Sequence, residues 1–193
     1  MRWPPTSPHL TEEQWNTQSL CDGWTVKNLV AHMTSTAQMN PLKFFGMFAM
    51  NGFNMAKMQA GEVVRLSEGS GAAVLGRFNE VLDSESTPPG PVDSWLGEAI
   101  VHAEDIRRPL GIEQDYPIEL LTQVLDFYKN SNLLIGTKSR IAGVQLKATD
   151  TDWSFGEGPA IEGQMLALLM AATGRREYLN EFTSEGLAII SGR

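Results

Sequence analysis

The sequence of 193 residues contains a single cysteine, Cys21, which excludes an intramolecular disulfide and a zinc site built from several cysteines. A lone cysteine can act as a nucleophile, but that role needs a nearby base and an electropositive setting. Cys21 is followed by Asp22, and free cysteine is commonly a small core residue. We therefore expect Cys21 to be a buried structural thiol.

Long apolar runs and an excess of positive charge are also missing. The stretch from Met165 to Ala172 falls well short of the roughly 20 residues that a membrane span needs. The N-terminal Met-Arg-Trp-Pro-Pro lacks the apolar stretch of a secretory signal. The formal net charge of -8 would repel a phosphate backbone. These absences predict a cytoplasmic protein with neither nucleic acid nor membrane as its partner.

The remaining composition is that of an ordinary globular protein. Hydrophobic residues make up 42% and charged residues 20%, which is sufficient for a packed core and argues against disorder. Because domains commonly have about 100 to 150 residues, we expect one domain with a small appendage. The expected division is a helical bundle over residues 1–140 and a small α+β domain over residues 141–193.

Helical periodicity dominates the first part of the chain. Thr25 is a suitable N-cap for a helix that ends near Met39, and Pro41 ends or kinks that helix. A following helix rich in methionine and phenylalanine is weakened by Gly46 and Gly52. Its apolar side chains are either core filler or an adaptable lining for a substrate pocket. Helices are expected over residues 25–39, 44–58, 71–82, 93–108 and from 117 onward, with a short turn at 11–15 and a linker at 84–91.

The C-terminal part changes character. Val144, Leu146 and Ala148 alternate with polar residues, as in a half-buried strand. Gly174 fits the residue that follows a helix. We expect strands at 144–149, 153–155 and 160–162, then a helix over 164–173.

The chain's histidines are few, and two of the three lie inside predicted helices. Glu98 and His102 are four residues apart, so they share one helix face. His32 from a facing helix would complete two imidazoles and one carboxylate, leaving a position for water or substrate. Structural zinc sites have four protein ligands, so three ligands indicate catalysis. Nitrogen and oxygen donors suit zinc, with iron, nickel or manganese as alternatives.

The Glu98–His102 pair and the nearby Asp105 each have more than one interpretation. Glu-x-x-x-His pairs also occur on helix surfaces, but Glu98 and His102 lie among apolar residues, and burial demands a partner for them. Asp105 could orient His102 or His32 by accepting the imidazole proton. Alternatively it pairs with Arg108 at the surface, and the spacing does not separate these arrangements.

Three separated segments resemble a known family. Gln14 to Met33 reads QWNTQSLCDGWTVKNLVAHM and resembles the opening motif of the maleylpyruvate isomerase family of mycothiol-dependent enzymes. GEAIVHAEDI, from Gly97 to Ile106, is similar to a second motif of that family. The segment from Lys147 through Arg175 resembles the short C-terminal portion of this actinobacterial family.

The resemblance implies a fold and a chemistry. The fold would be a mainly α, DinB-like up-and-down four-helix bundle with a small C-terminal α/β appendage. His32, Glu98 and His102 match the family's zinc ligands. Mycothiol would supply the thiol, bound at the open position of the metal, for isomerisation of an electrophilic small molecule or transfer onto it. A non-catalytic metal or small-ligand binding module of the same fold is the alternative.

The resemblance also has implications for Arg175 and for the two ends of the chain. Isomerases of the family use an arginine near their C-terminal part to meet a substrate carboxylate, and Arg175 matches it. Alternatively, Arg175 and Arg176 complement a helix C-terminus. Family members begin with a full helix, whereas about ten residues precede Thr11 here. A truncated first helix would expose apolar surface and favour a homodimer. The short C-terminal portion argues against maleylpyruvate itself as the substrate.

Overall fold

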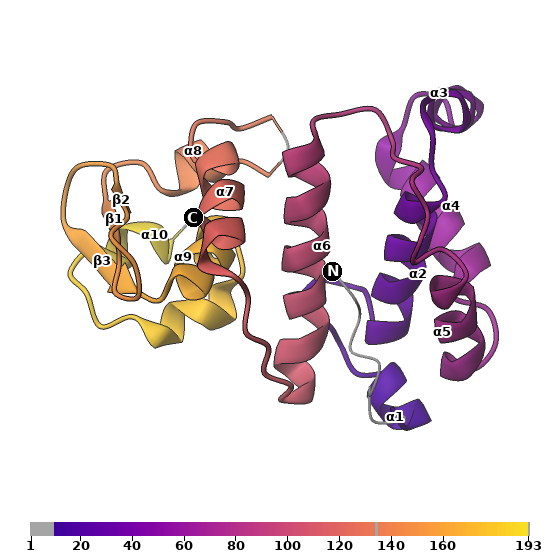
Figure 1. Cartoon of the computed structure of the whole chain (residues 1–193), viewed down its shortest axis with the longest axis horizontal. Coiled ribbons are helices and arrows are strands. Elements are labelled where there is room, and N and C mark those ends of the chain that lie inside the picture. The colour runs from indigo at the N-terminus through magenta and orange to yellow at the C-terminus, as the bar shows by residue number, and fades with distance from the viewer. Residues whose placement is uncertain (1–9, 134, 193) are drawn as a thin grey trace. The chain divides into compact units, whose positions relative to one another are not determined.

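The computed structural model describes residues 10–133 and 135–192, which are mainly helical with a small sheet (Figure 1). This confirms the expected mainly α class with a small C-terminal α/β part. No helix in the described ranges is long and apolar enough to cross a membrane. The described elements are α1 Glu12–Trp15, α2 Val26–Ala37, α3 Pro41–Met50, α4 Met55–Leu66, α5 Gly71–Asn79, α6 Val92–Arg107, η1 Arg108–Leu110, α7 Ile118–Tyr128, α8 Thr137–Arg140, β1 Gln145–Ala148, β2 Ser154–Phe155, β3 Ala160–Gly163, α9 Met165–Ala172, η2 Arg176–Glu181 and α10 Leu187–Ile190.

The chain forms two compact units, and the boundary between them falls inside the continuous helix α6. The first unit consists of residues 1–91 and 102–113, and the second of residues 92–101 and 114–193. α7 belongs to the second unit because it packs against α9. The folding domains expected on either side of residue 140 remain a proposal.

Capping side chains fix where the first helices begin. The Thr11 hydroxyl accepts from the Gln14 amide, and the Gln14 side chain accepts from the Thr11 amide. Thr25 and Asn28 form the same reciprocal pair at the start of α2. Such pairs satisfy amide groups that a helix N-terminus otherwise leaves without partners. The register of α2, which carries His32, is therefore set by local sequence.

The single helix expected over residues 44–58 is wrong. α3 begins earlier, at Pro41, and ends at Met50, and α4 begins at Met55 after the N-cap Asn54. Between them Gly52 and Phe53 have φ angles of 67° and 58°, which a right-handed helix does not allow. The interruption therefore turns the chain into two helices that pack on each other.

The core of the first unit lies where α2 packs against α4 and α5. Each large side chain that is fully buried there stabilises the fold by about 1.5 to 3 kcal/mol relative to exposure. Ile106 brings the last turn of α6 into the same cluster. The buried members are Trp15, Val26, Leu29, Val30, Ala31, Leu66, Val74, Phe78 and Ile106.

The second unit combines a three-stranded sheet with α7 and α9. β1 is central, antiparallel to β2 and parallel to β3, and Leu146 pairs with Phe155 on one side and Ile161 on the other. α9 is buried along nearly its whole length, in keeping with a helix that is apolar all round. The Asp150 carboxylate accepts from the Met165 amide at 3.0 Å and so caps the start of α9.

A glycine in α6 allows the close approach of α7 within the second unit. A Cβ atom added at Gly97 would lie 2.6 Å from Cε2 of the Tyr128 ring. Gly76 in α5 is also helical, but a Cβ atom there meets nothing within 4 Å. Packing therefore requires a glycine at position 97, whereas nothing in the packing requires one at position 76.

We expect Gly97→Ala to lower the free energy of unfolding by about 1 to 3 kcal/mol, because the added methyl forces the Tyr128 ring to move. Gly76→Ala is the matched control, and it should raise stability by about 0.5 to 1 kcal/mol through helix propensity. Urea denaturation of both variants measures the difference. Equal effects of the two substitutions would contradict the proposed contact.

Candidate metal centre

Two histidine rings, one on α2 and one on α6, lie edge to face in the first unit. The ring centroids of His32 and His102 are 5.2 Å apart, with an angle of 85° between their planes. His32 is buried, with 7% of its surface exposed, and the Trp24 ring lies 4.9 Å from it. A buried imidazole needs a partner for its ring nitrogens. The pair of rings is thus well placed to share a ligand.

Asp105 is fully buried beside His102. Its Oδ2 lies 2.9 Å from Nδ1 of His102, three residues earlier on α6. A contact with His102 was one of the arrangements that the sequence left open. A carboxylate acceptor favours the tautomer with the proton on Nδ1 and leaves the Nε2 lone pair for another ligand. The contact therefore gives His102 the form that a metal ligand requires.

Cys21 reaches the same place, a contact that the sequence reasoning missed. Its Sγ lies 3.1 Å from Oδ2 of Asp105 and 3.7 Å from Nδ1 of His102, and the side chain is only half-buried. The amide of Leu20 donates to the Asp105 carbonyl at 3.0 Å, which ties this loop to α6. Only the position of Cys21 within the motif that also holds Trp24 could have indicated a site role.

Glu98 lies one turn before His102 on α6. His32, Glu98 and His102 each offer one ligand atom, and these atoms lie within 4.8 Å of one another. Donors around a tetrahedral zinc ion at 2.0 to 2.2 Å are about 3.4 Å apart, so small rotamer changes would close the set. Two imidazoles and one carboxylate form a donor set that suits zinc.

A second group of donors is formed by Cys21, His102 and Asp105 within the same distance limit. Its members already contact one another through Nδ1 of His102. A metal at this nitrogen would displace the hydrogen bond to Asp105. A metal bound at Nε2 of His102 would leave that bond intact.

The charge of Glu98 affects the pKa of Tyr128 in the second unit. Burial, and then the negative charge of Glu98, raise the pKa of the Tyr128 phenol to about 12, while Arg175 acts in the opposite direction. The phenol donates to the Ser94 carbonyl at 3.4 Å. Tyr128 is therefore a neutral hydrogen-bond donor at physiological pH.

Arg175 follows the end of α9. One of its Nη atoms donates to the Thr173 carbonyl at 2.9 Å, which fits a cation that complements a helix C-terminus. Its charge also acts on Tyr128 and lowers the pKa of Arg140, after the larger effect of burial. The structure thus supports the capping interaction and also places the guanidinium within electrostatic range of Tyr128.

Comparison with known proteins found a family match for part of the chain. Residues 7–78 match the family model described as the mycothiol maleylpyruvate isomerase N-terminal domain. The matched segment contains His32 and ends before α6, which carries Glu98 and His102. No curated protein and no solved structure matched the chain.

The pKa of Tyr128 predicts a loss of stability in alkali. The phenol ionises near pH 10 in an unfolded chain and near pH 12 in the folded one, so the folded state holds this proton more tightly. Its contribution is complete below pH 10 and is lost as pH rises to about 12. Tyr128→Phe should show a shallower fall in melting temperature over this range. Identical alkaline profiles for variant and wild type would refute the shift.

Proposed function

We propose that this chain, which carries the N-terminal domain of the mycothiol maleylpyruvate isomerase family in residues 7–78, is a metal-dependent enzyme that uses mycothiol. The reaction would transfer the thiol onto an electrophilic small molecule or isomerise that molecule. The proposed metal ligands are His32, Glu98 and His102, with zinc as the ion. The observation that carries the proposal is the gathering of these three donors from α2 and α6.

The donor set fits the chemistry that a mycothiol-dependent reaction needs. Three protein ligands leave a coordination position open, as in catalytic rather than structural zinc sites. A bound zinc ion would supply Lewis acidity, which lowers the pKa of a coordinated thiol and favours its nucleophilic form. The chain then needs no cysteine nucleophile of its own.

The protein's part is to hold the donors in register and keep their surroundings dry. Asp105 accepts the Nδ1 proton of His102, which orients the ring and raises the basicity of Nε2. The Trp24 ring lies against His32, and the burial of His32 limits its rotation. These contacts reduce the reorganisation needed when a metal binds.

Arg175 has a proposed role in substrate recognition. Its guanidinium and the charge of Glu98 both act on the Tyr128 phenol, so the three groups lie in one electrostatic neighbourhood of the second unit. An arginine suits a carboxylate because its planar donors can bind two oxygens at once. We propose that Arg175 binds a carboxylate on the electrophilic substrate. Because the thiol must be reduced to react, we place the reaction in the cytoplasm.

Metal content is the direct test of the ligand set. We expect wild type to bind one zinc per chain and His32→Ala and His102→Ala to lose nearly all of it, because each removes one of three donors. Asp105→Asn should retain zinc with an affinity about 10 to 100 times weaker. Elemental analysis and competition with a chromogenic chelator measure both quantities.

His9→Ala is the matched control, since it removes the remaining histidine of the sequence and should leave zinc content unchanged. Full zinc in both His32→Ala and His102→Ala would overturn the proposed site. Loss of zinc in Cys21→Ser, with retention in Glu98→Ala, would instead assign the metal to the second donor group.

Turnover measurements test whether mycothiol supplies the attacking sulfur. Zinc-loaded protein should consume mycothiol with a panel of electrophiles, and Cys21→Ser should keep most of this activity because the attacking sulfur comes from the cosubstrate. Loss of the free thiol over time is the measurement, with chelated protein as the control. Tight binding of mycothiol without turnover would favour the non-catalytic binding module, and inactivity of Cys21→Ser with full zinc would make Cys21 the nucleophile.

A further inference from the structure

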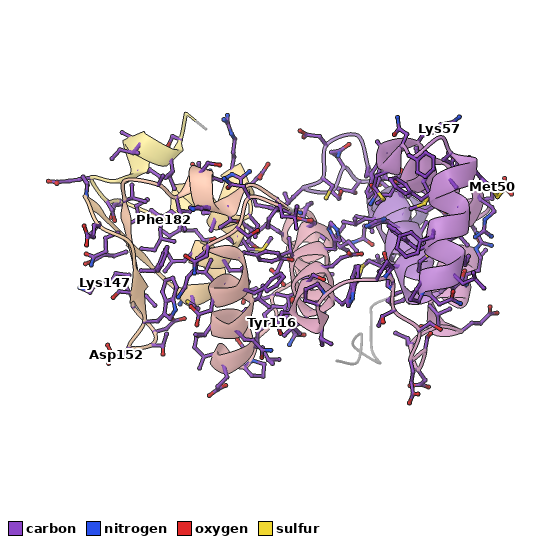
Figure 2. All side chains as sticks on the ribbon, turned by 90° about the horizontal axis from the view of Figure 1, so that it is seen from above. Met50, Lys57, Tyr116, Lys147, Asp152 and Phe182 are labelled. Atoms are coloured by element: carbon purple, nitrogen blue, oxygen red, sulfur yellow. The ribbon has the colours of Figure 1, made fainter. Side chains whose placement is uncertain are left out.

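The outward side of α3 is entirely apolar. Among its ten residues none is fully buried, and the exposed positions recur at helical spacing. Leu42 is 87% exposed and Met50 86%, and Phe53 in the following turn is 73% exposed. Figure 2 shows the Met50 side chain on the outside of this part of the molecule. The α3 face, as we name it, consists of Pro41, Leu42, Phe45, Gly46, Ala49 and Met50, extended by Phe53.

The inner side of the same helix is largely apolar, with Lys43 as its polar residue. Phe44 and Phe48 are half-buried and stack with a centroid distance of 5.9 Å, and Phe53 packs edge-on against Phe48. A helix with a single polar residue belongs largely in a buried position. The inner side of α3 packs on α4, whereas the α3 face is open to solvent.

Gly46 has no explanation within the chain. It lies in the interior of α3, where glycine costs about 1 kcal/mol relative to alanine. A Cβ atom added there would meet nothing within 4 Å, so no internal contact requires the missing side chain. Gly46 and Ala49 lie near the middle of the α3 face, with Leu42, Phe45 and Met50 around them. Small residues at such a position let the backbone of another helix approach closely.

The area of the face matches what a protein interface needs. A fully exposed large apolar side chain presents roughly 150 to 250 Å². Leu42, Phe45, Met50 and Phe53 therefore expose on the order of 500 Å², near the upper end of the largest patches on monomeric proteins. Pairing two such faces would bury on the order of 1,000 Å² in total, which is about the lower limit for a specific interface.

The charges around the face discriminate between partners. Residues 23–61 contain no acidic residue, and their lysines are Lys27, Lys43 and Lys57. Lys43 is half-buried and acts on Glu62, and Lys57 is exposed on α4 (Figure 2). Recruitment to an anionic lipid surface takes four to eight clustered basic residues, and this chain carries a net charge of -8. A second copy needs no basic cluster, because two copies of the uncharged face would pair apolar side chains with apolar side chains.

We propose that the α3 face binds the same face of a second copy of this chain, forming a two-fold dimer in which the helices cross near Gly46. Two-fold pairing places Leu42, Phe45 and Met50 of each helix beside the small residues of the other. The inference is independent of the proposed metal chemistry, because it uses a surface of the first unit apart from His32 and His102.

Sedimentation velocity over a range of protein concentrations tests the dimer. Wild type should show a monomer–dimer equilibrium, and the pair Phe45→Ser with Met50→Ser should raise the dissociation constant at least about tenfold. The matched control is Leu133→Ser, which removes an equally exposed residue, at 88%, and should leave the dimer unchanged. A wild type that is monomeric at all concentrations overturns the proposal. If that monomer also sediments with anionic vesicles, the face binds membranes instead.

A second variant separates loss of the interface from loss of the fold. Gly46→Gln places a side chain in the crossing point, and it should abolish the dimer while the melting temperature of the monomer rises or stays the same. Gly46→Cys in a Cys21→Ser background should form a disulfide-linked dimer on oxidation, because the two Gly46 positions face each other. Retention of the dimer in Gly46→Gln, or failure of the cross-link in a dimeric sample, contradicts the α3 crossing.

Discussion

The register of one helix governs the candidate centre. On α6, Glu98, His102 and Asp105 are spaced so that all three fall on one side of a regular α-helix, and the hydrogen bond from His102 to Asp105 locks that arrangement. A single residue inserted between Glu98 and Asp105 would rotate the two parts of the set by about 100° relative to each other and separate one of the carboxylates from the imidazole. His32 can complete the set only because α2 is held against the same core by its capped start and its buried stripe.

Much of this arrangement is visible in the sequence, because helix periodicity and caps are local signals. The Thr25 cap, the four-residue spacing of Glu98 and His102, and the strand alternation around Leu146 all predict the elements found. The break between α3 and α4 was not predicted, since a phenylalanine at φ 58° carries no signal in its residue type. Nor was the contact of Cys21, because it depends on a tertiary packing of residues more than eighty positions apart.

The position of Cys21 bears on how the chemistry is divided between protein and cosubstrate. Its thiol donates to the Asp105 carboxylate, which also contacts Nδ1 of His102. The same carboxylate strengthens His102 as a metal ligand. In the proposed centre, one buried carboxylate would therefore engage the protein's own sulfur and also orient a ligand of the ion.

The dimer surface and the metal ligands are connected through α2. His32 lies in its middle, and only three residues, 38–40, separate its end from α3. Because the connection is short and close-packed elements transmit strain, a displacement of α3 would be passed on to the end of α2. A partner that fixes α3 would therefore restrain the end of the helix that carries His32. Self-association through α3 would in this way add to the preorganisation that Asp105 and Trp24 begin, without contributing any ligand to the centre.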